Sequence, residues 1–259
     1  MAVKNCAKFD IVIDCGNLVC GGCMQERKKM MEKAIQYLEK NRLLHIGMLE
    51  AIRKGNAEIL EASEEGVLLL DRSCNVHMMS AANQEKGKAL LDQITDCYQL
   101  IVCQEELVPY ASEKFGMYTL FPCKKVVRFS KEKLDLETDL RIERADEAHV
   151  AMIKEVYHTI PPEEVDEISR RGNLFCAFAG EEFVGFSGNH LDGSLGLLDI
   201  FPAYQGRGYG EALERFMVNY ILDKGDIPYG EIVIGNTISE NLQRKLGFEI
   251  SEETITWLL

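Results

Sequence analysis

Hydrophobic positions recur along the chain with two periods, one typical of helices and one typical of strands. Across residues 26–54 apolar side chains stand three and four positions apart, for example at Ile35, Leu38 and Leu49, and Gly55 ends the pattern. The segments "GVLLLD" and "NVHMMS" flank "RSC", which predicts a β-hairpin. Helix-like and strand-like segments then alternate as far as "KKVVRFS". The first half of the chain is therefore predicted to be an α/β unit.

The pattern restarts after the charged segment "KEKLDLET". "LRIERA" predicts a strand, "DEAHVAMIKEVYH" a helix capped by Asp146, and "PPEEVDEISRRGN" a second helix opened by prolines. Two strands around "AGEE" and a third in "DGSLGLLDIF" follow, then a long helix, the strand "GEIVIGN", a short helix that ends at Gly247, and a last strand. Both halves contain a hairpin, then a helix, then a strand, which favours a diverged structural duplication.

The length of 259 residues is comfortable for two domains. We predict a leader over residues 1–24, an N-terminal α/β domain over residues 25–135 and a C-terminal domain over residues 136–259. No apolar run reaches the length of a membrane span, and Asp10 and Asp14 interrupt the apolar stretch near the N-terminus. A soluble, cytoplasmic protein without a membrane partner is therefore expected.

Charge and cysteine content narrow the function further. The net charge of −13 argues against a nucleic-acid partner, because such a surface repels phosphates. Nine cysteines, an odd number, favour a reducing compartment over a disulfide scaffold. Cys6, Cys15, Cys20 and Cys23 lie in the predicted leader, where "CGGC" has the spacing of half a zinc site. Because no second tight pair follows at the spacing of a zinc finger, we predict no metal.

The stretch "IFPAYQGRGYGEALERF" places Gly206, Gly208 and Gly210 where a helix must begin. A helix N-terminus exposes unpartnered amides with a partial positive charge, and glycines let an anion come close to them. Arg207 can add a charge-assisted bond or simply point to water. Since Glu211 stands where G-x-G-x-x-G needs a glycine, and no G-K-[ST] follows, neither a dinucleotide fingerprint nor a P-loop is present. A glycine-rich turn without a ligand is the alternative.

Gln205, Gly208 and Gly210 also match the pattern [QR]-x-x-G-x-[GA]. With "LRIERADEAHVAMI" before it and "NTISENLQRKLGF" after it, the region from about Leu140 to the end resembles the GNAT superfamily of acyltransferases. The two halves resemble the glycine N-acyltransferase-like branch, in which a degenerate GNAT-like half comes first. The resemblance implies an α/β (α+β) fold: a mixed, mostly antiparallel GNAT-like sheet flanked by helices, preceded by a smaller degenerate GNAT-like α/β half.

The activity that this resemblance implies is transfer of an acetyl or other acyl group from acyl-CoA, the co-substrate, to the amine of a small molecule, amino acid or peptide. The pyrophosphate would lie on the glycine-rich loop and the pantetheine arm along the preceding strand, as an added strand. Asn236 and Ser239 match positions near the pantetheine, although both could instead cap the last helix. The predicted acyl-CoA-binding residues are Leu198, Ile200, Gln205, Gly206, Arg207, Gly208, Tyr209, Gly210, Asn236 and Ser239.

The chemistry needs a base, because an alkyl amine with a pKa of about 10 is protonated at neutral pH. Asp199 is a candidate because it interrupts an apolar strand, and His190 and Glu231 end or open neighbouring strands. Each could equally be a structural or solvent-exposed group. Many members of the family have a tyrosine that acts as the general acid, whereas at this position this chain has Gln243, which cannot supply a proton. An acyl-CoA-binding sensor that has lost catalysis is therefore the alternative function.

Overall fold

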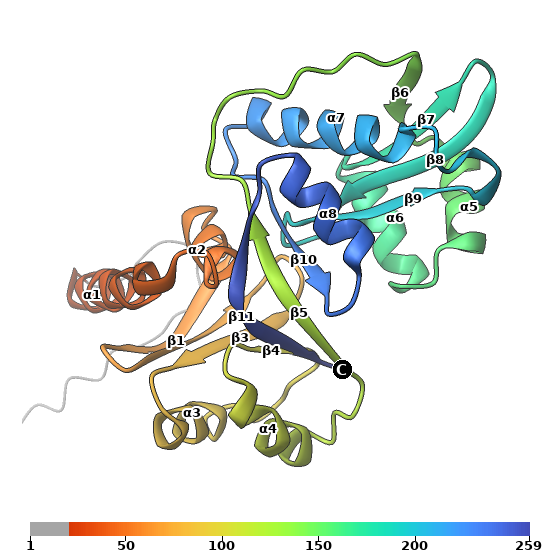
Figure 1. The fold of residues 1–259 in the computed structure, drawn as a ribbon. Helices are drawn as coiled ribbons and strands as arrows, with labels where there is room; N and C mark the ends of the chain where they lie inside the picture. Colours follow the sequence, from red (N-terminus) through yellow and green to blue (C-terminus); the bar gives the residue numbers. More distant parts are fainter. Residues whose placement is uncertain (1–20) are drawn as a thin grey trace, which may run out of the picture.

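The computed structural model describes residues 21–259, and the expectations for Cys6, Cys15 and Cys20 lie outside this part of the chain (Figure 1). Helix α1 begins at Gly21, within the last residues of the predicted leader 1–24. We call residues 21–127 the N-terminal half and residues 140–259 the C-terminal half. Across residues 21–259, none of the helices combines the length and the apolar composition that a membrane-spanning segment requires.

The N-terminal half confirms the predicted hairpin and differs at its start. The single helix predicted over residues 26–54 is two helices, because the Asn41 side chain accepts a hydrogen bond from the Leu44 amide (3.2 Å) and so competes with the helical backbone. One strand, β1, was not predicted. The elements are α1 (Gly21–Leu38), η1 (Glu39–Asn41), α2 (Ile46–Arg53), β1 (Ala57–Ser63), β2 (Gly66–Asp71), β3 (Val76–Ala81), α3 (Gln84–Leu91), β4 (Leu100–Val102), η2 (Glu105–Leu107), α4 (Val108–Phe115) and β5 (Leu120–Val127).

The C-terminal half follows the predicted order of elements. Asp146 caps the first helix, as expected, by accepting a hydrogen bond from the His149 amide (2.9 Å). The elements are β6 (Leu140–Arg144), α5 (Glu147–Val156), α6 (Pro162–Arg170), β7 (Leu174–Ala179), β8 (Glu182–Asn189), β9 (Leu195–Ile200), η3 (Pro202–Tyr204), α7 (Tyr209–Asp223), β10 (Tyr229–Val233), α8 (Thr237–Lys245) and β11 (Glu249–Leu258).

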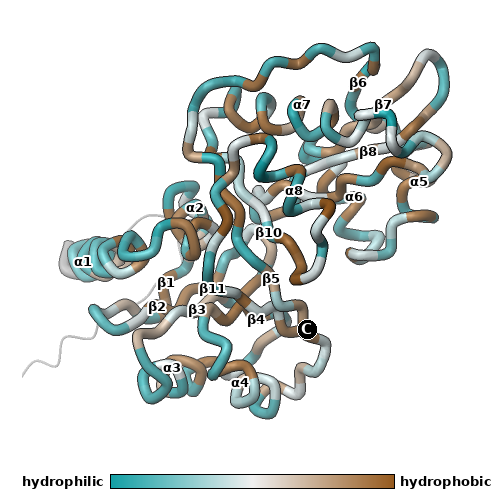
Figure 2. The backbone as a smooth tube through the Cα atoms, viewed as in Figure 1, coloured by the Kyte–Doolittle hydropathy of each residue, from teal (hydrophilic) through white to brown (hydrophobic). Residues whose placement is uncertain are grey.

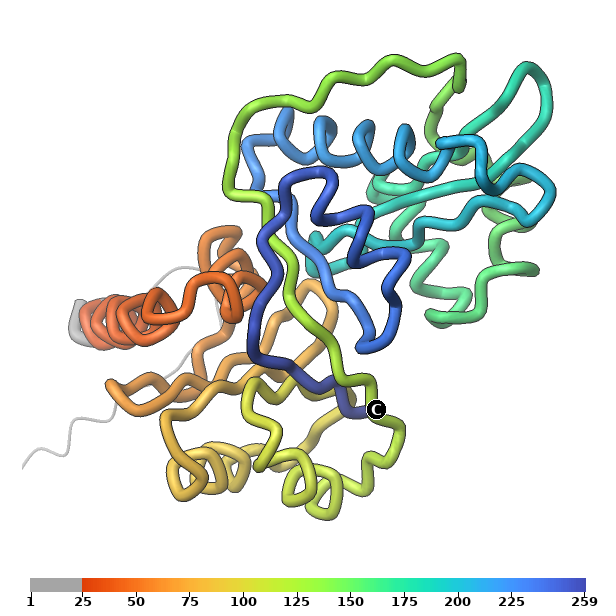
Figure 3. The backbone as a smooth tube through the Cα atoms, viewed as in Figure 1, coloured from red at the N-terminus to blue at the C-terminus, as the bar shows by residue number. Residues whose placement is uncertain are grey.

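Within residues 21–259, the eleven strands form one mixed, mostly antiparallel sheet in the order β1-β2-β3-β4-β11-β5-β10-β9-β8-β7-β6. The last strand of each half lies beside a strand of the other half: β11 pairs with β4, and β5 pairs with β10 (Figure 3). The segment 128–139, without helix or strand, connects the halves. The fold class is therefore confirmed. The division into two domains stays a prediction, because one continuous sheet contains strands of both halves.

Helices cover both faces of this sheet. The core clusters place α1, α2, α5 and α6 on one face and α3, α4, α7 and α8 on the other. Hydrophobic residues concentrate along the strands and polar residues on the outer sides of the helices (Figure 2). On β9, Leu198 and Ile200 point toward α7, whereas Leu197 packs in the cluster under α5 and α6. One face of β9 is therefore covered by α7 and the opposite face by α5 and α6.

Candidate active site

The glycine-rich loop joins β9 to α7 and takes a conformation that needs glycine. Gly206 has φ of +75° and Gly208 has φ of +81°, in the left-handed region that side chains rarely adopt. A Cβ atom at either position would meet nothing within 4 Å, so the loop faces open space. At Gly210 a Cβ would lie 3.6 Å from Cγ1 of Ile200. The backbone of the loop at Gly206 and Gly208 is therefore open to a ligand, whereas the first turn of α7 packs closely on β9.

The N-terminus of α7 differs from those of three other helices. Side chains of Asn83, Asp146 and Asn236 cap α3, α5 and α8, whereas Gly208 stands at the N-cap of α7 and no side chain caps it. Within residues 21–259, the amides of residues 206–210 donate to no protein acceptor. Five successive free amides at a helix N-terminus can bind an anion.

The neighbouring side chains hold this loop in place. Gln205 donates from Nε2 to the Ile200 carbonyl (2.8 Å), which fixes the loop to the end of β9. Arg207 donates from Nη2 to the Ala203 carbonyl (3.1 Å), and its guanidinium lies 5.4 Å from the ring centre of Tyr204. In this conformation Arg207 supports the loop.

Two cations lie next to the first turn of α7. Glu211 accepts hydrogen bonds from Lys245 (2.5 Å) and Arg215 (2.9 Å), and these partners lower the pKa of its carboxyl. Lys245 and Arg215 therefore offset the negative charge of Glu211, which would otherwise oppose an anion at this helix end.

The strands beside the loop are splayed. Parallel strands β9 and β10 share one residue pair, Leu195 with Gly230, whereas the parallel strands β3 and β4 share three. Beyond that pair the β10-facing edge of β9 carries backbone groups without a neighbouring strand, and Leu198 and Ile200 lie in this stretch. An extended ligand can add to such an edge as a strand does.

A β-bulge re-aims the backbone of β9 in the same stretch. Leu197 has φ of +54°, and the pairing with β8 shifts there, so that two residues of β9 face one residue of β8. A β-bulge leaves one residue without a hydrogen-bonded partner on the neighbouring strand and changes the direction of the side chains next to it. The bulge therefore lies beside the opening between β9 and β10.

The candidate base Asp199 lies on the face of β9 that is covered by α5 and α6. It pairs with Phe186, whose ring contacts the ring of Tyr157 edge to face at 5.6 Å. The Asp199 carboxyl has no hydrogen bond or ion pair with the part of the chain that is described, and burial raises its pKa. Burial, together with the negative charge of Asp199, raises the pKa of Tyr157. Tyr157 stands at the C-terminal end of α5, and the sequence alone did not single it out.

His190 reaches the same face from the end of β8. Its Nδ1 lies 3.7 Å from Glu164 Oε1 of α6. Burial alone would lower the pKa of the ring, but Glu164, together with the negative charges of Asp192 and Glu231, outweighs burial and the pKa is raised. A Cβ at Gly196 would lie 2.1 Å from His190 Nε2, so the ring packs directly against β9. Asp199 and His190 are therefore both placed along β9.

The other predicted residues have partners of their own. Glu231 forms an ion pair with Lys125 of β5, with both side chains nearly buried, which makes Glu231 the least available of the three candidate bases. Asn236 accepts from the Ser239 amide (3.1 Å) and so acts as the cap of α8. The contact of either residue with a pantetheine arm stays a prediction.

Comparisons with known proteins relate the fold to solved structures. Residues 182–258 match the model of the FR47-like protein family. A Drosophila protein of solved structure is 14% identical with a TM-score of 0.65, and the match covers 91% of this chain and 96% of that chain. A GCN5-related N-acetyltransferase-like protein from Streptococcus suis is 13% identical with a TM-score of 0.52, and the match covers 87% of this chain and 99% of that chain. An acetyltransferase of the GNAT family from Colwellia psychrerythraea is 12% identical with a TM-score of 0.52, and the match covers 91% of this chain and 95% of that chain. No curated protein matches the sequence. At these identities the likeness concerns the fold.

Proposed function

We propose, from the premise that this chain has the fold of GNAT acetyltransferases and a C-terminal region like the FR47-like family, that the protein transfers an acyl group from acyl-CoA to an amine. The acceptor would be a small molecule, an amino acid or a peptide terminus. One observation carries the proposal: the free amides of residues 206–210 lie at an uncapped helix end, directly beside splayed parallel strands.

The residues present fit an acyl-CoA molecule. The open space around Gly206 and Gly208 lets a diphosphate approach the amides, and the β10-facing edge of β9 can pair with an amide-bearing arm. When bound, acyl-CoA supplies an activated acyl group as a thioester. Leu198 and Ile200 lie along this edge, and backbone amides near the bulge can donate to an oxygen that gains negative charge.

The attacking amine must first lose a proton, and Asp199 is best placed among the candidates to accept it. Its carboxyl has no described partner, lies half-buried beside the bulge, and has a pKa raised by burial. A base whose pKa moves toward the operating pH transfers protons more effectively. His190, held by Glu164, is the second candidate on this face.

The proposal is tested by measuring thiol release from acetyl-CoA with a panel of amines, together with thermal stabilisation by CoA, NAD and ATP. Release with at least one amine and stabilisation by CoA support an acyltransferase. Stabilisation by CoA without release on any amine would support the sensor instead. Stabilisation by NAD or ATP and none by CoA would exclude both.

A further inference from the structure

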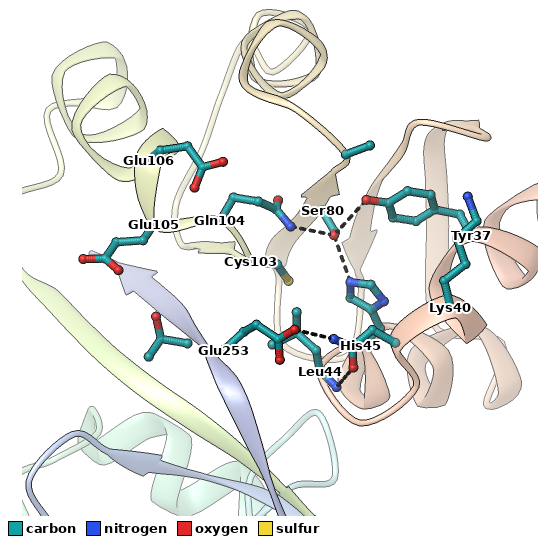
Figure 4. Close-up of a pocket in the computed structure, with 13 residues that line it drawn as sticks. Tyr37, Lys40, Leu44, His45, Ser80, Cys103, Gln104, Glu105, Glu106 and Glu253 are labelled. Atoms are coloured by element: carbon teal, nitrogen blue, oxygen red, sulfur yellow. Dashed lines mark hydrogen bonds between the residues drawn. The ribbon is translucent and has the colours of Figure 1, made fainter.

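The N-terminal half contains a cavity of about 510 Å³ that the acyl-transfer site does not use (Figure 4). It opens at the carboxyl ends of the parallel strands β3 and β4, between the end of α1 and η2, and β11 contributes one wall. Ligands commonly bind outside the carboxyl ends of parallel strands. The cavity therefore corresponds in position to the opening beside β9 and β10 in the other half.

A neutral hydrogen-bond network forms one side of this cavity. His45 donates from Nδ1 to the Leu38 carbonyl (2.9 Å), so its Nε2 accepts from Ser80 Oγ (2.9 Å). Gln104 Nε2 donates to Ser80 Oγ (3.0 Å), and the Tyr37 hydroxyl lies 3.3 Å away. Burial lowers the pKa of His45, which keeps the ring neutral near pH 7. Because Ser80 is fully buried and its oxygen is already surrounded by partners, the network suits binding and not nucleophilic attack.

The mouth of the cavity is acidic. Glu105, Glu106 and Glu253 line it, and Lys40 is the cation among the lining residues. The Lys40 ammonium donates to a backbone carbonyl in the β1–β2 turn (2.9 Å). The carboxylates of Glu105 and Glu106 have no partner within residues 21–259, and Glu253 accepts one bond from Asn41 (3.1 Å). The lining therefore carries more negative than positive charge.

The features that fit acyl-CoA in the C-terminal half are missing here. Strands β3 and β4 stay paired over three residues, which leaves no opening for a pantetheine arm. The N-terminus of α3 is capped by Asn83, whose side chain accepts from the Lys86 amide (2.9 Å). An acidic mouth also repels a diphosphate. The cavity is thus unsuited to an acyl-CoA and suited to a cation.

We infer that this cavity is a binding site for a small organic ammonium ion. The ammonium group binds on the acidic side of the lining, where Glu106 and Glu253 point toward the cavity, and the alkyl part extends toward Tyr37 on the opposite wall. Charge-assisted hydrogen bonds to carboxylates supply the attraction. The exposed carboxylates make binding sensitive to salt. This site is independent of the proposed acyl transfer, which uses the other half of the sheet.

The test is a calorimetric titration of the full chain with 1,4-diaminobutane, with 1,4-butanediol as the uncharged probe of similar shape. A double variant, Glu105→Gln with Glu106→Gln, is compared with Glu132→Gln with Glu137→Gln, which removes the same charge from two exposed residues of the connecting segment 128–139. We expect the pocket variant to bind the diamine about tenfold more weakly, the control variant to bind it as the wild type does, and the diol not to bind.

Equal weakening in both double variants would show general attraction to an acidic protein and would overturn the inference, as would a wild type that does not bind the diamine. Trp257, the single tryptophan, lies on β11 with Glu253 and gives a second signal through its fluorescence. Gly208→Asp, which disrupts the acyl-CoA loop, should bind the diamine as the wild type does. A failure of the acyl-transfer proposal would therefore leave this inference standing, and the reverse also holds.

Discussion

Lys125 of β5 and Glu231 of β10 form a nearly buried ion pair across the two strands that join the halves of the protein. The side chains are 4% and 11% exposed, and the residues stand directly opposite each other. Burial alone would lower the pKa of Lys125, but Glu231 outweighs it and the pKa is raised, so the ammonium is charged at neutral pH. The pair therefore favours this register between β5 and β10.

Glu231→Gln should destabilise the protein by about 3–5 kcal/mol, because it leaves the Lys125 ammonium buried without its partner. The control is Glu240→Gln, which breaks an exposed pair with Arg244 on α8 and should cost at most about 0.5 kcal/mol. Urea unfolding of both variants gives the two values. Equal costs would mean that the Lys125–Glu231 pair is solvated.

Gly208→Asp should weaken CoA binding at least about tenfold, because it places a carboxylate where the loop amides would face the proposed diphosphate. The matched control is Gly225→Asp at the other end of α7, where φ is +76° and a Cβ also meets nothing within 4 Å. Both substitutions strain a left-handed residue, so both should cost about 1 kcal/mol of stability. Titration with CoA separates them, and unchanged affinity in Gly208→Asp would refute the loop assignment.

Asp199→Asn should lower kcat by roughly 10²–10⁴-fold and leave the Kd for acetyl-CoA unchanged, because it removes the proposed base and leaves the proposed binding loop intact. The ionised carboxylate accepts the proton, so activity is lost as pH falls through its pKa. Because burial raises that pKa, the acidic limb of kcat/KM should lie above the ordinary carboxyl range. The limb should vanish in Asp199→Asn. If it vanishes in His190→Gln instead, His190 is the base.

The glycine-rich loop was predictable because its signal is local. Gly206 and Gly208 stand within a few residues of the helix that they open, and their left-handed backbone follows from the residue type. The splay of β9 and β10 was not predictable in the same way, since it depends on which strand lies beside β10. That strand is β5, from the other half of the chain.

The errors in the N-terminal half also have physical causes. The helix predicted over residues 26–54 ignored Asn41, whose side chain bonds to the backbone three residues on and breaks the helix. Strand β1 escaped notice because it is an edge strand, half-exposed along almost its whole length, so its sequence lacks the alternation of a strand with one buried face. The partner of Glu231 was hidden too, because Lys125 is distant in sequence.

Gln243 of α8 and Glu214 of α7 form a buried hydrogen-bonded pair. Gln243 donates from Nε2 to Glu214 Oε1 (2.7 Å), both side chains are buried, and burial raises the pKa of Glu214 above its usual value of 4.5. The folded state therefore favours the neutral acid. As pH rises above about 4.5 the unfolded chain ionises first, and the folded protein loses stability until the raised pKa is passed.

Glu214→Gln keeps an acceptor for Gln243 Nε2 and cannot ionise, so it should gain stability relative to the wild type as pH rises from 4.5 to 8. Each unit of difference in pKa is worth about 1.4 kcal/mol. Unfolding free energies across this pH range measure the effect, with Glu155→Gln on the exposed side of α5 as the control. A difference that stays constant with pH would mean that Glu214 is ionised in the folded protein. In that case a cation or an ordered water must lie beside it, because Gln243 alone cannot stabilise a buried carboxylate.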